Sequence, residues 1–390
     1  MQNHHLAIIP SVPVWKDQTV LFFDRKFYDG IIQYTERWPG KITCILCVSS
    51  TSLSGFGVIE VDEKELPFQC ILLKEGEQIA ETHLSNVSIV LASADAHDQL
   101  HVSSLCRKAG IKCVYVIEYI PETRYQIAAL ETKNPLLLLR RIIYLRQQEK
   151  KRMAAFDISD GLQSNGTPAY YQYRKYRNNL LYFDTRVFSE HMIARNDLQK
   201  RLDDLSLGKP IRLAFSGRLI RMKGADHLVK LAGMLKQRGL PFSFVIYGTG
   251  DQEQEMKSYI SQHSLGGEVS MPGAVDFYRT LLPEIQQKTD LFVCLHRQSD
   301  PSCTYLETLS CGVPIVGYKN RAFAGILDLA DTGWGTEMND IEGIAGIIER
   351  LNGNRAEIAE KSRNSLNFAS KHDFETTFQK RIDQLLSVTG

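Results

Sequence analysis

The sequence lacks long apolar runs and has no excess of charge of either sign. No stretch of about 18 apolar residues occurs, and the amino terminus, Met-Gln-Asn-His-His, is not a basic segment followed by an apolar one. We therefore expect a soluble, cytoplasmic protein. The 46 basic and 45 acidic residues give a formal net charge of +1, so the charge balance does not favour nucleic acid as a partner.

Clustered cysteines are also missing. The eight cysteines are scattered, and the closest, Cys44 and Cys47, stand three apart in an apolar run. On a strand, residues three apart face opposite sides, so this pair is poorly placed for a shared metal or a disulfide. We expect buried free thiols in a reducing compartment.

What is present is the pattern of an α/β protein. The 390 residues, 43% of them hydrophobic, can bury two ordinary cores. Short apolar runs alternate with helical patterns, which predicts parallel sheets covered by helices. Strands are expected at 42–48, 87–92, 113–117, 180–183, 211–216 and 242–247. The charged segment 184–210 is interpreted as the linker between two domains.

The stretch 299–318, SDPSCTYLETLSCGVPIVGY, lies between two apolar runs that we expect to be strands. Asp300 suits a helix N-cap, Pro301 the first helical position and Gly312 the exit, so a helix is predicted from about 301 to 311. Its amino end would lie at the carboxyl end of a strand, where anionic ligands bind in open α/β sheets. Asp300 and Glu307 would then share one helix face; a plain cap and a solvated carboxylate are the alternatives.

Three segments resemble the retaining glycosyltransferases of family 4, which have the GT-B fold. Residues 307–316 are similar to that family's E-A-x-A-x-G-x-P-V-V, residues 215–224 to its G-R-L-x-x-x-K-G, and residues 245–251 to its I-x-G-x-G. The resemblance covers about 206–370. It implies two Rossmann-like domains facing across a cleft: an acceptor-binding domain at 1–205, a donor-binding domain at 206–371, and a carboxyl-terminal helix at 372–390 that crosses back to the first domain.

The implied activity is transfer of a sugar from a nucleotide diphosphate, a UDP- or GDP-sugar, to a glycan, lipid-linked or small-molecule acceptor. Surface polysaccharide or glycoconjugate biosynthesis is the implied setting, with no metal or other cofactor. Arg218 and Lys223 would hold the leaving diphosphate, together with the amides of Ser302, Cys303 and Thr304. Glu307 would accept hydrogen bonds from ribose hydroxyls.

The resemblance also nominates further donor-side residues: Gly217, Gly248, Gly250, Pro272, His296 and Tyr305. One departure concerns the first glutamate of the family, which stands eight positions before the residue that matches Glu307. This chain has Ser299 there, and the adjacent Asp300 is expected to take that role.

Acceptor-side candidates follow strands of the first half. They are Lys16 and Asp17, in the proline-rich segment 10–17 that we expect to be a loop, and Asp95 and His97. A surface histidine and a helix cap are the alternatives for the last two. Glu118 stands where many family members carry a histidine, and it would stabilise a positively charging sugar carbon; a structural pair with Arg124 is the alternative.

Residues 136–153 carry six basic residues among aliphatic ones. Such a helix either lies on the inner face of an anionic membrane or packs with a charged outer face, and both readings stay open. For the whole chain, the alternatives to a transferase are a non-catalytic GT-B protein that binds a nucleotide sugar or a partner, and a GT-B epimerase or phosphorylase.

Overall fold

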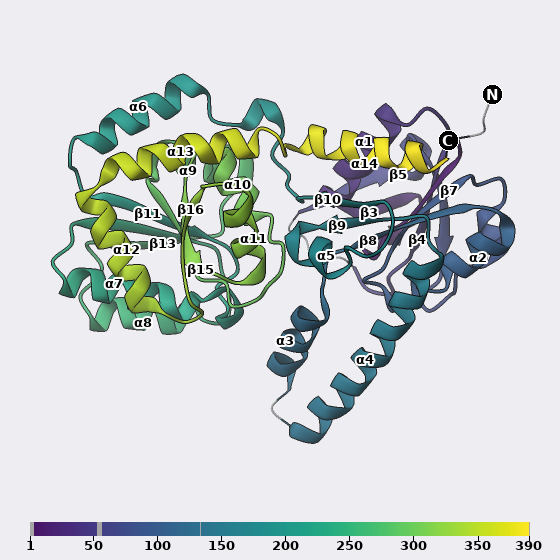
Figure 1. Cartoon of the computed structure of the whole chain (residues 1–390), viewed down its shortest axis with the longest axis horizontal. Helices are drawn as coiled ribbons and strands as arrows, with labels where there is room; N and C mark the ends of the chain where they lie inside the picture. Colours follow the sequence, from purple (N-terminus) through teal and green to yellow (C-terminus); the bar gives the residue numbers. More distant parts are fainter. Residues whose placement is uncertain (1–3, 53–56, 133, 390) are drawn as a thin grey trace. The chain divides into compact units, whose positions relative to one another are not determined.

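The structure is a computed structural model that describes residues 4–52, 57–132 and 134–389. Its internal contacts divide the chain into two compact units (Figure 1). Unit 1 comprises Met1–Tyr182 and Glu375–Gly390, and unit 2 comprises Phe183–Phe374. Each unit contains one parallel sheet with helices packed around it, so the predicted α/β class is confirmed.

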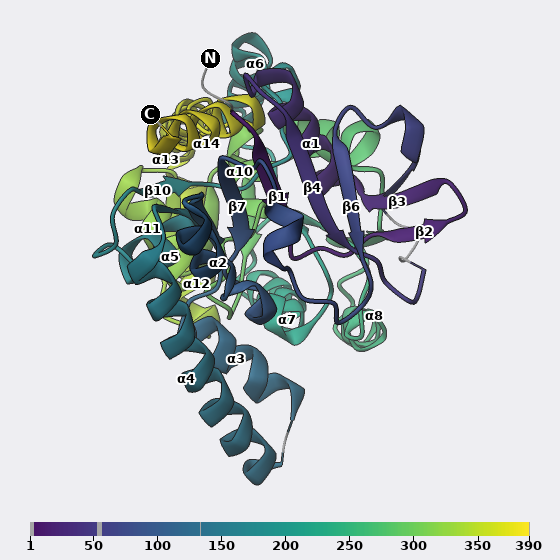
Figure 2. The ribbon, with the colours of Figure 1, turned by 90° about the vertical axis from the view of Figure 1, so that its right-hand side faces the viewer.

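Unit 1 is built on a seven-stranded parallel sheet in the order β10-β9-β8-β7-β1-β4-β6, part of which is seen in Figure 2. Its strands are β1 (Leu6–Ile9), β4 (Ile42–Cys47), β6 (Gln69–Leu73), β7 (Ile89–Ser93), β8 (Lys112–Ile117), β9 (Gly161–Asn165) and β10 (Asn179–Tyr182). Its helices are α1 (Arg25–Arg37), α2 (Val102–Ala109), α3 (Pro121–Glu131), α4 (Pro135–Ile158), α5 (Gly166–Gln172) and α14 (Phe374–Thr389). The central strands are buried along their whole length, which is why most of them are continuous apolar runs.

A small antiparallel sheet accompanies the large one. It consists of β2 (Trp15–Asp17), β3 (Val20–Asp24) and β5 (Val58–Asp62). Lys16 and Asp17, expected in a loop after the first strand, instead lie on β2, where Lys16 Nζ is 2.6 Å from a carboxylate oxygen of Glu63. The prediction of an irregular segment there is wrong at these two residues, because Trp15 pairs with Phe22 and draws the chain into a hairpin.

Unit 2 is built on a six-stranded parallel sheet in the order β13-β12-β11-β14-β15-β16. Its strands are β11 (Ile211–Ser216), β12 (Phe242–Tyr247), β13 (Val269–Gly273), β14 (Leu291–Cys294), β15 (Ile315–Tyr318) and β16 (Gly333–Thr336). Its helices are α6 (Arg195–Ser206), α7 (Ala225–Gln237), α8 (Glu253–Gln262), α9 (Leu282–Lys288), α10 (Thr304–Ser310), α11 (Arg321–Leu329), α12 (Ile341–Gly353) and α13 (Arg355–Ala369).

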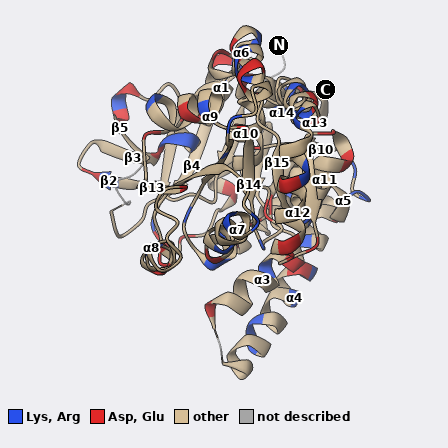
Figure 3. Ribbon diagram, turned by 90° about the vertical axis from the view of Figure 1, so that its left-hand side faces the viewer, with Lys and Arg blue, Asp and Glu red and all other residues tan. Residues whose placement is uncertain are grey.

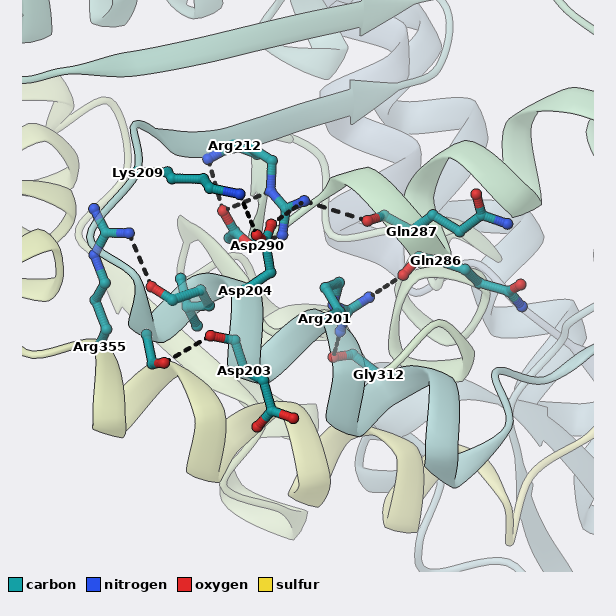
Figure 4. A network of polar contacts seen from close by, with 12 residues as sticks. Arg201, Asp203, Asp204, Lys209, Arg212, Gln286, Gln287, Asp290, Gly312 and Arg355 are labelled. Atoms are coloured by element: carbon teal, nitrogen blue, oxygen red, sulfur yellow. Dashed lines mark hydrogen bonds and ion pairs between the residues drawn. The ribbon is translucent and has the colours of Figure 1, made fainter.

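Helix α6 lies in the segment that the sequence assigns to the linker. In the structure it packs within unit 2, where the buried guanidinium of Arg201 donates hydrogen bonds to the backbone oxygens of Gln286 and Gly312 (Figure 4) and to that of Cys311. The division between the units therefore falls after Tyr182 instead of after residue 205, and α14 contributes its residues from Glu375 onward to unit 1.

Candidate functional site in unit 2

The candidate site is formed by the segments that follow β11 and β14. These strands are parallel neighbours, with Leu213 beside Leu291, so the segments after them leave the same edge of the sheet. After β11 the chain makes a loop that ends in one turn of 3₁₀ helix, Arg221–Lys223. After β14 it runs through His296 and Asp300 to α10. The two segments are joined by an ion pair between Lys223 Nζ and Asp300 Oδ2 at 2.9 Å.

The Lys223–Asp300 pair is largely buried. The side chains are 9% and 14% exposed, and the second carboxylate oxygen of Asp300, Oδ1, is buried without a hydrogen-bond partner. A buried carboxylate oxygen is costly when it accepts no hydrogen bond, so this atom is suited to meet a donor from a ligand. Sequence reasoning selected both residues but did not predict that they pair.

The predicted role of Asp300 as a helix cap is wrong. Helix α10 begins at Thr304, after Cys303, and not at Pro301. The carboxylate of Asp300 is held by Lys223 instead, and its backbone oxygen accepts the amide of Ser302 at 2.9 Å. The amide of Ser302 is thereby used within the chain, while the amides of Cys303 and Thr304 remain predicted diphosphate contacts. Asp300 and Glu307 do not share a helix face.

Arg218 differs from Lys223 in its surroundings. Its side chain is exposed, and among the described residues it forms no hydrogen bond or ion pair. Arg221, in the same loop, is also exposed but contacts Gln252 and Glu255. Arg218 is therefore a guanidinium at the strand ends that is available for an anion, because no carboxylate of unit 2 neutralises it.

His296 follows β14 and is completely buried. Both of its ring nitrogens lack a hydrogen-bond partner, while its backbone oxygen accepts from Asn320 Nδ2 at 3.0 Å. Burial, with a smaller contribution from Lys223, holds the pKa of His296 well below its ordinary value of 6.5. The ring is therefore neutral, with one nitrogen able to donate and the other able to accept.

The glycines of the two loops allow close approach of backbone to backbone. Gly248 has φ +123°, and a Cβ there would lie 1.9 Å from the carbonyl oxygen of Gly217. At Gly250 a Cβ would lie 2.4 Å from the carbonyl oxygen of Leu219. The structure thus explains both glycines by loop packing. Their contact with a nucleotide remains a prediction, as does that of the exposed Pro272 on the edge strand β13.

Glu307 is only 11% exposed, and its Oε1 accepts from Arg186 Nε at 2.7 Å. The guanidinium of Arg186 also lies 3.9 Å from the centre of the Phe277 ring. Sequence reasoning missed Arg186, which lies in the presumed linker. The available signal was the position of Glu307 between Leu306 and Leu309, where a carboxylate needs a cationic partner. A ribose contact would therefore use the oxygen that Arg186 leaves free.

Tyr305 is a core residue and not an open donor contact. It is 1% exposed, stacks on Phe323 and accepts a hydrogen bond from Asn320 at 2.9 Å. This corrects its assignment to the donor side. Beside it, Ser302 Oγ donates to Thr304 Oγ1 at 3.1 Å, and Cys303 Sγ lies 3.7 Å from Asp184 Oδ2.

The acceptor-side candidates Asp95 and His97 lie in unit 1. Asp95 pairs with Arg124 and accepts the amides of Glu118 and Tyr119 at 2.8 and 3.2 Å. His97 Nδ1 is 3.2 Å from Arg152, and burial together with Arg152 lowers the pKa of His97 to about 4. Asp95 thus organises the turn after β8, and the guanidinium of Arg124 donates to the carboxylate of Asp95.

Asp95 also borders a cavity of about 640 Å³ between α3 and α4, within unit 1. Its lining includes Tyr119, Arg124, Ile127 and Leu145. In the part of the chain that the structure describes, no group of three or more His, Cys, Asp or Glu side chains could hold a metal. Nor, within that part, does any helix combine the length and apolar character needed to cross a bilayer.

Comparison with known proteins finds one family over part of the chain. Residues 199–372 match the family described as Glycosyl transferases group 1. The amylovoran biosynthesis glycosyltransferase AmsK of Erwinia amylovora is 23% identical over 189 residues, which are 45% of this chain and 43% of AmsK. The match thus spans less than half of that relative's length.

Solved structures match over nearly the whole chain. HepE from Anabaena, determined in complex with UDP-glucose, is 15% identical with a TM-score of 0.62, covering 98% of this chain and 99% of that one. Sucrose-phosphate synthase from Thermosynechococcus elongatus is 14% identical with a TM-score of 0.66, covering 99% and 98%. Likeness at these identities establishes the fold. Residues 199–372 therefore form a glycosyl transferases group 1 domain, and the chain as a whole has the GT-B fold.

Proposed function

We propose that this protein is a retaining glycosyltransferase that moves a sugar from a UDP- or GDP-sugar to an acceptor in surface polysaccharide or glycoconjugate biosynthesis. The acceptor would be a glycan, a lipid-linked sugar or a small molecule, met at the cytoplasmic face of a membrane. The observation that carries the proposal is the guanidinium of Arg218, unpaired among the described residues, in the same loop after β11 as Lys223 of the Lys223–Asp300 pair. The names of AmsK and of the UDP-glucose complex of HepE support it.

The chemistry follows from charge. When the bond between sugar and diphosphate breaks, negative charge grows on the diphosphate, and catalysis requires groups that stabilise it. Arg218 would contact two oxygens with its planar fork, and Lys223 would exchange one contact with Asp300 for a phosphate oxygen. The unpartnered Oδ1 of Asp300 would accept from a sugar hydroxyl, the role expected of the glutamate that Ser299 replaces. No metal ion is needed in this scheme, because Arg218 and Lys223 would supply the positive charge that the diphosphate requires.

The first test is binding. UDP and GDP are added separately to the purified chain, and the one that matches the donor should raise the unfolding temperature, since a ligand that binds only the folded state stabilises it. The second test is turnover. We expect nucleoside diphosphate to be released only when both donor and acceptor are present, at a rate that EDTA leaves unchanged, and the product should keep the anomeric configuration of the donor.

A non-catalytic nucleotide-sugar binder is the second candidate. Two observations favour it: Asp300 already neutralises Lys223, and Ser299 stands where the family has a glutamate. Such a protein would be stabilised by the nucleotide but would release none from a donor with any acceptor fraction. Stabilisation without turnover would therefore replace the transferase proposal by this one.

A further inference from the structure

Helices α3 and α4 form a hairpin that extends away from the sheet of unit 1 (Figures 1 and 2). Large hydrophobic side chains are exposed at its outer end. Among the described residues, six of the eleven exposed large hydrophobic side chains lie here: Leu130, Leu136, Leu137, Leu139, Ile143 and Tyr144. The side chain of Leu136 is 76% exposed. A concentration of this kind on an otherwise polar surface marks an interaction site.

On α4, the exposed hydrophobic residues recur at helical spacing. Leu136, Leu139 and Ile143 follow one another by three and four residues, so they form one stripe along the helix. Leu138 and Ile142, on the other side of α4, are partly buried instead. The outer end of α4 is thus apolar on both sides, and only one side is covered.

The charges around the stripe are mainly basic, and the exposed Glu131 at the end of α3 is paired with Arg141. Arg140, Arg146, Lys150 and Lys151 are exposed and form no ion pair with the described residues, and Figure 3 shows basic bands along α4. By contrast, Glu149 is 12% exposed and contacts the buried Arg152. An apolar stripe flanked by unpaired basic residues is the pattern of a helix that lies in the interface of an anionic bilayer.

We propose that the end of the α3–α4 hairpin, defined by the six exposed residues above, inserts into the headgroup region of an anionic membrane. The flanking cations would bind lipid phosphates while the leucines and Ile143 enter the acyl boundary. The charges favour this occupant over a second copy of the chain, because a symmetric contact would place Arg140, Arg146 and Lys150 against the same residues of the other copy. The hairpin would rest on the membrane and not span it.

The proposal also suggests where the acceptor binds, and this part of it rests on the proposed function. The cavity of about 640 Å³ is walled by the same two helices, through Ile127 of α3 and Leu145 of α4. Arg124 and Asp95 supply polar groups there, and Leu145 and Ile127 supply apolar ones. An acceptor with a polar head and a lipid chain would have its chain in the bilayer and its head beside this cavity.

The test uses the full-length chain and sedimentation with vesicles, without any donor, so that its outcome does not depend on catalysis. One set of vesicles contains phosphatidylcholine alone and the other also contains phosphatidylglycerol. We expect binding to the anionic vesicles only. The triple variant Leu136→Ser, Leu139→Ser, Ile143→Ser should lose at least about tenfold in partitioning, because each buried aliphatic side chain contributes substantially.

The charge variant Arg140→Gln, Arg146→Gln, Lys150→Gln should also weaken binding, by several-fold per residue. The matched control is Leu207→Ser, Leu329→Ser, which removes two exposed leucines from unit 2 and should bind as the wild type does. Circular dichroism should show all variants folded, since every altered side chain is exposed. Wild-type protein that stays in solution with anionic vesicles, or a triple variant that binds equally well, overturns the proposal. So does a dimer that needs the leucines and excludes vesicles.

Discussion

Arg218 and Lys223 are the two cations expected to face the diphosphate. Because their surroundings differ, substitutions at the two positions should affect turnover and stability differently. Arg218 is exposed and unpaired within the described residues, whereas Lys223 is buried against Asp300. We predict that Arg218→Ala lowers turnover by about 10²-fold or more, as loss of a group that stabilises transition-state charge does, without lowering the unfolding temperature. Lys223→Ala should lower both, since it leaves Asp300 buried without its cation.

Steady-state kinetics and thermal unfolding of the two variants check this pair of outcomes. Arg221→Ala is the matched control, because Arg221 belongs to the same loop, is exposed and is not expected to contact the diphosphate. It should keep near wild-type turnover. Normal kinetics in both Arg218→Ala and Lys223→Ala would contradict the assignment of this loop to the diphosphate.

The neutral ring of His296 makes unit 2 sensitive to acid. Its pKa is held well below 6.5 by burial, so the unfolded chain binds a proton that the folded chain does not. The free energy of unfolding should therefore be unaffected above about pH 6.5 and fall below it, by up to about 1.4 kcal/mol per pH unit from this residue. In His296→Gln the acid sensitivity should be smaller, because glutamine does not titrate.

Urea unfolding at a series of pH values measures this slope. His97, whose pKa is also lowered, will leave some acid sensitivity in every variant, so the comparison is between slopes. His263→Gln, an exposed histidine after α8, should show the wild-type slope. Equal slopes in His296→Gln and wild type would mean that the ring is not neutral in the folded state.

At the scale of elements, the buried Arg201 is one of the side chains that hold α6 in unit 2, together with Leu198, Leu202 and Leu205. Arg201 is 4% exposed, and burial lowers its pKa to about 10. It donates to the backbone oxygens of Gln286 at 2.7 Å and Cys311 at 2.9 Å, and to that of Gly312 (Figure 4). Two of these carbonyls belong to Cys311, the C-cap of α10, and to Gly312 after it, so Arg201 satisfies backbone oxygens at the end of that helix.

We predict that Arg201→Met lowers the free energy of unfolding by about 2–4 kcal/mol. Methionine keeps much of the volume but removes the donor from three carbonyl oxygens, and the two in buried contacts are each worth roughly 1–3 kcal/mol before relaxation. Arg201→Lys should recover part of the loss, because an ammonium can reach one carbonyl. Arg195→Ala, at the exposed start of α6, should change little. Denaturant titration gives all three values. An Arg201→Met protein as stable as Arg195→Ala would refute the stabilising role of the Arg201 hydrogen bonds.

Elements with continuous apolar sequences could be predicted and those held by distant polar partners could not. Strands β4, β7, β8, β11 and β12 lie within two residues of their expected positions, because strands buried on both faces are apolar throughout. Asp300 is the clearest failure. Its local sequence is that of a helix cap, but Lys223, 77 residues away, holds the carboxylate. Arg186 was missed for the same reason, since its partner Glu307 is 121 residues away.

At the scale of the whole molecule, unit 1 is completed by the last helix of the chain. Strand β9, with the sequence GLQSN, is wholly buried although it contains three polar residues. Its Gln163 is satisfied by α14: Arg381 Nε donates to Gln163 Oε1 at 2.7 Å, and Gln163 Nε2 donates to the backbone oxygen of Arg381 at 3.0 Å. A strand stabilised by a helix 218 residues downstream has no local signature, which is why the sequence did not predict it.

Phe378 is the apolar anchor of α14 in unit 1. Its ring packs edge-on against Tyr34 with centroids 5.4 Å apart, and it lies so near Gly30 that a Cβ there would be 2.8 Å from the ring. We predict that Phe378→Ala destabilises unit 1 by about 3–5 kcal/mol, as loss of a buried phenylalanine does. Helix α14 should then detach more often, and β9 should open with it because Gln163 loses its partners.

Hydrogen exchange measured by mass spectrometry can follow the two units separately. In Phe378→Ala, peptides from β9 and β10 should exchange faster, while peptides from β11 and β12 of unit 2 should exchange as in the wild type, because the part of α14 that contains Phe378 belongs to unit 1. Gln379→Ala, the next residue and exposed, is the matched control. If Phe378→Ala instead accelerated exchange equally in β9 and β11, unfolding of the two units would be coupled, and the last helix would stabilise the whole chain and not unit 1 alone.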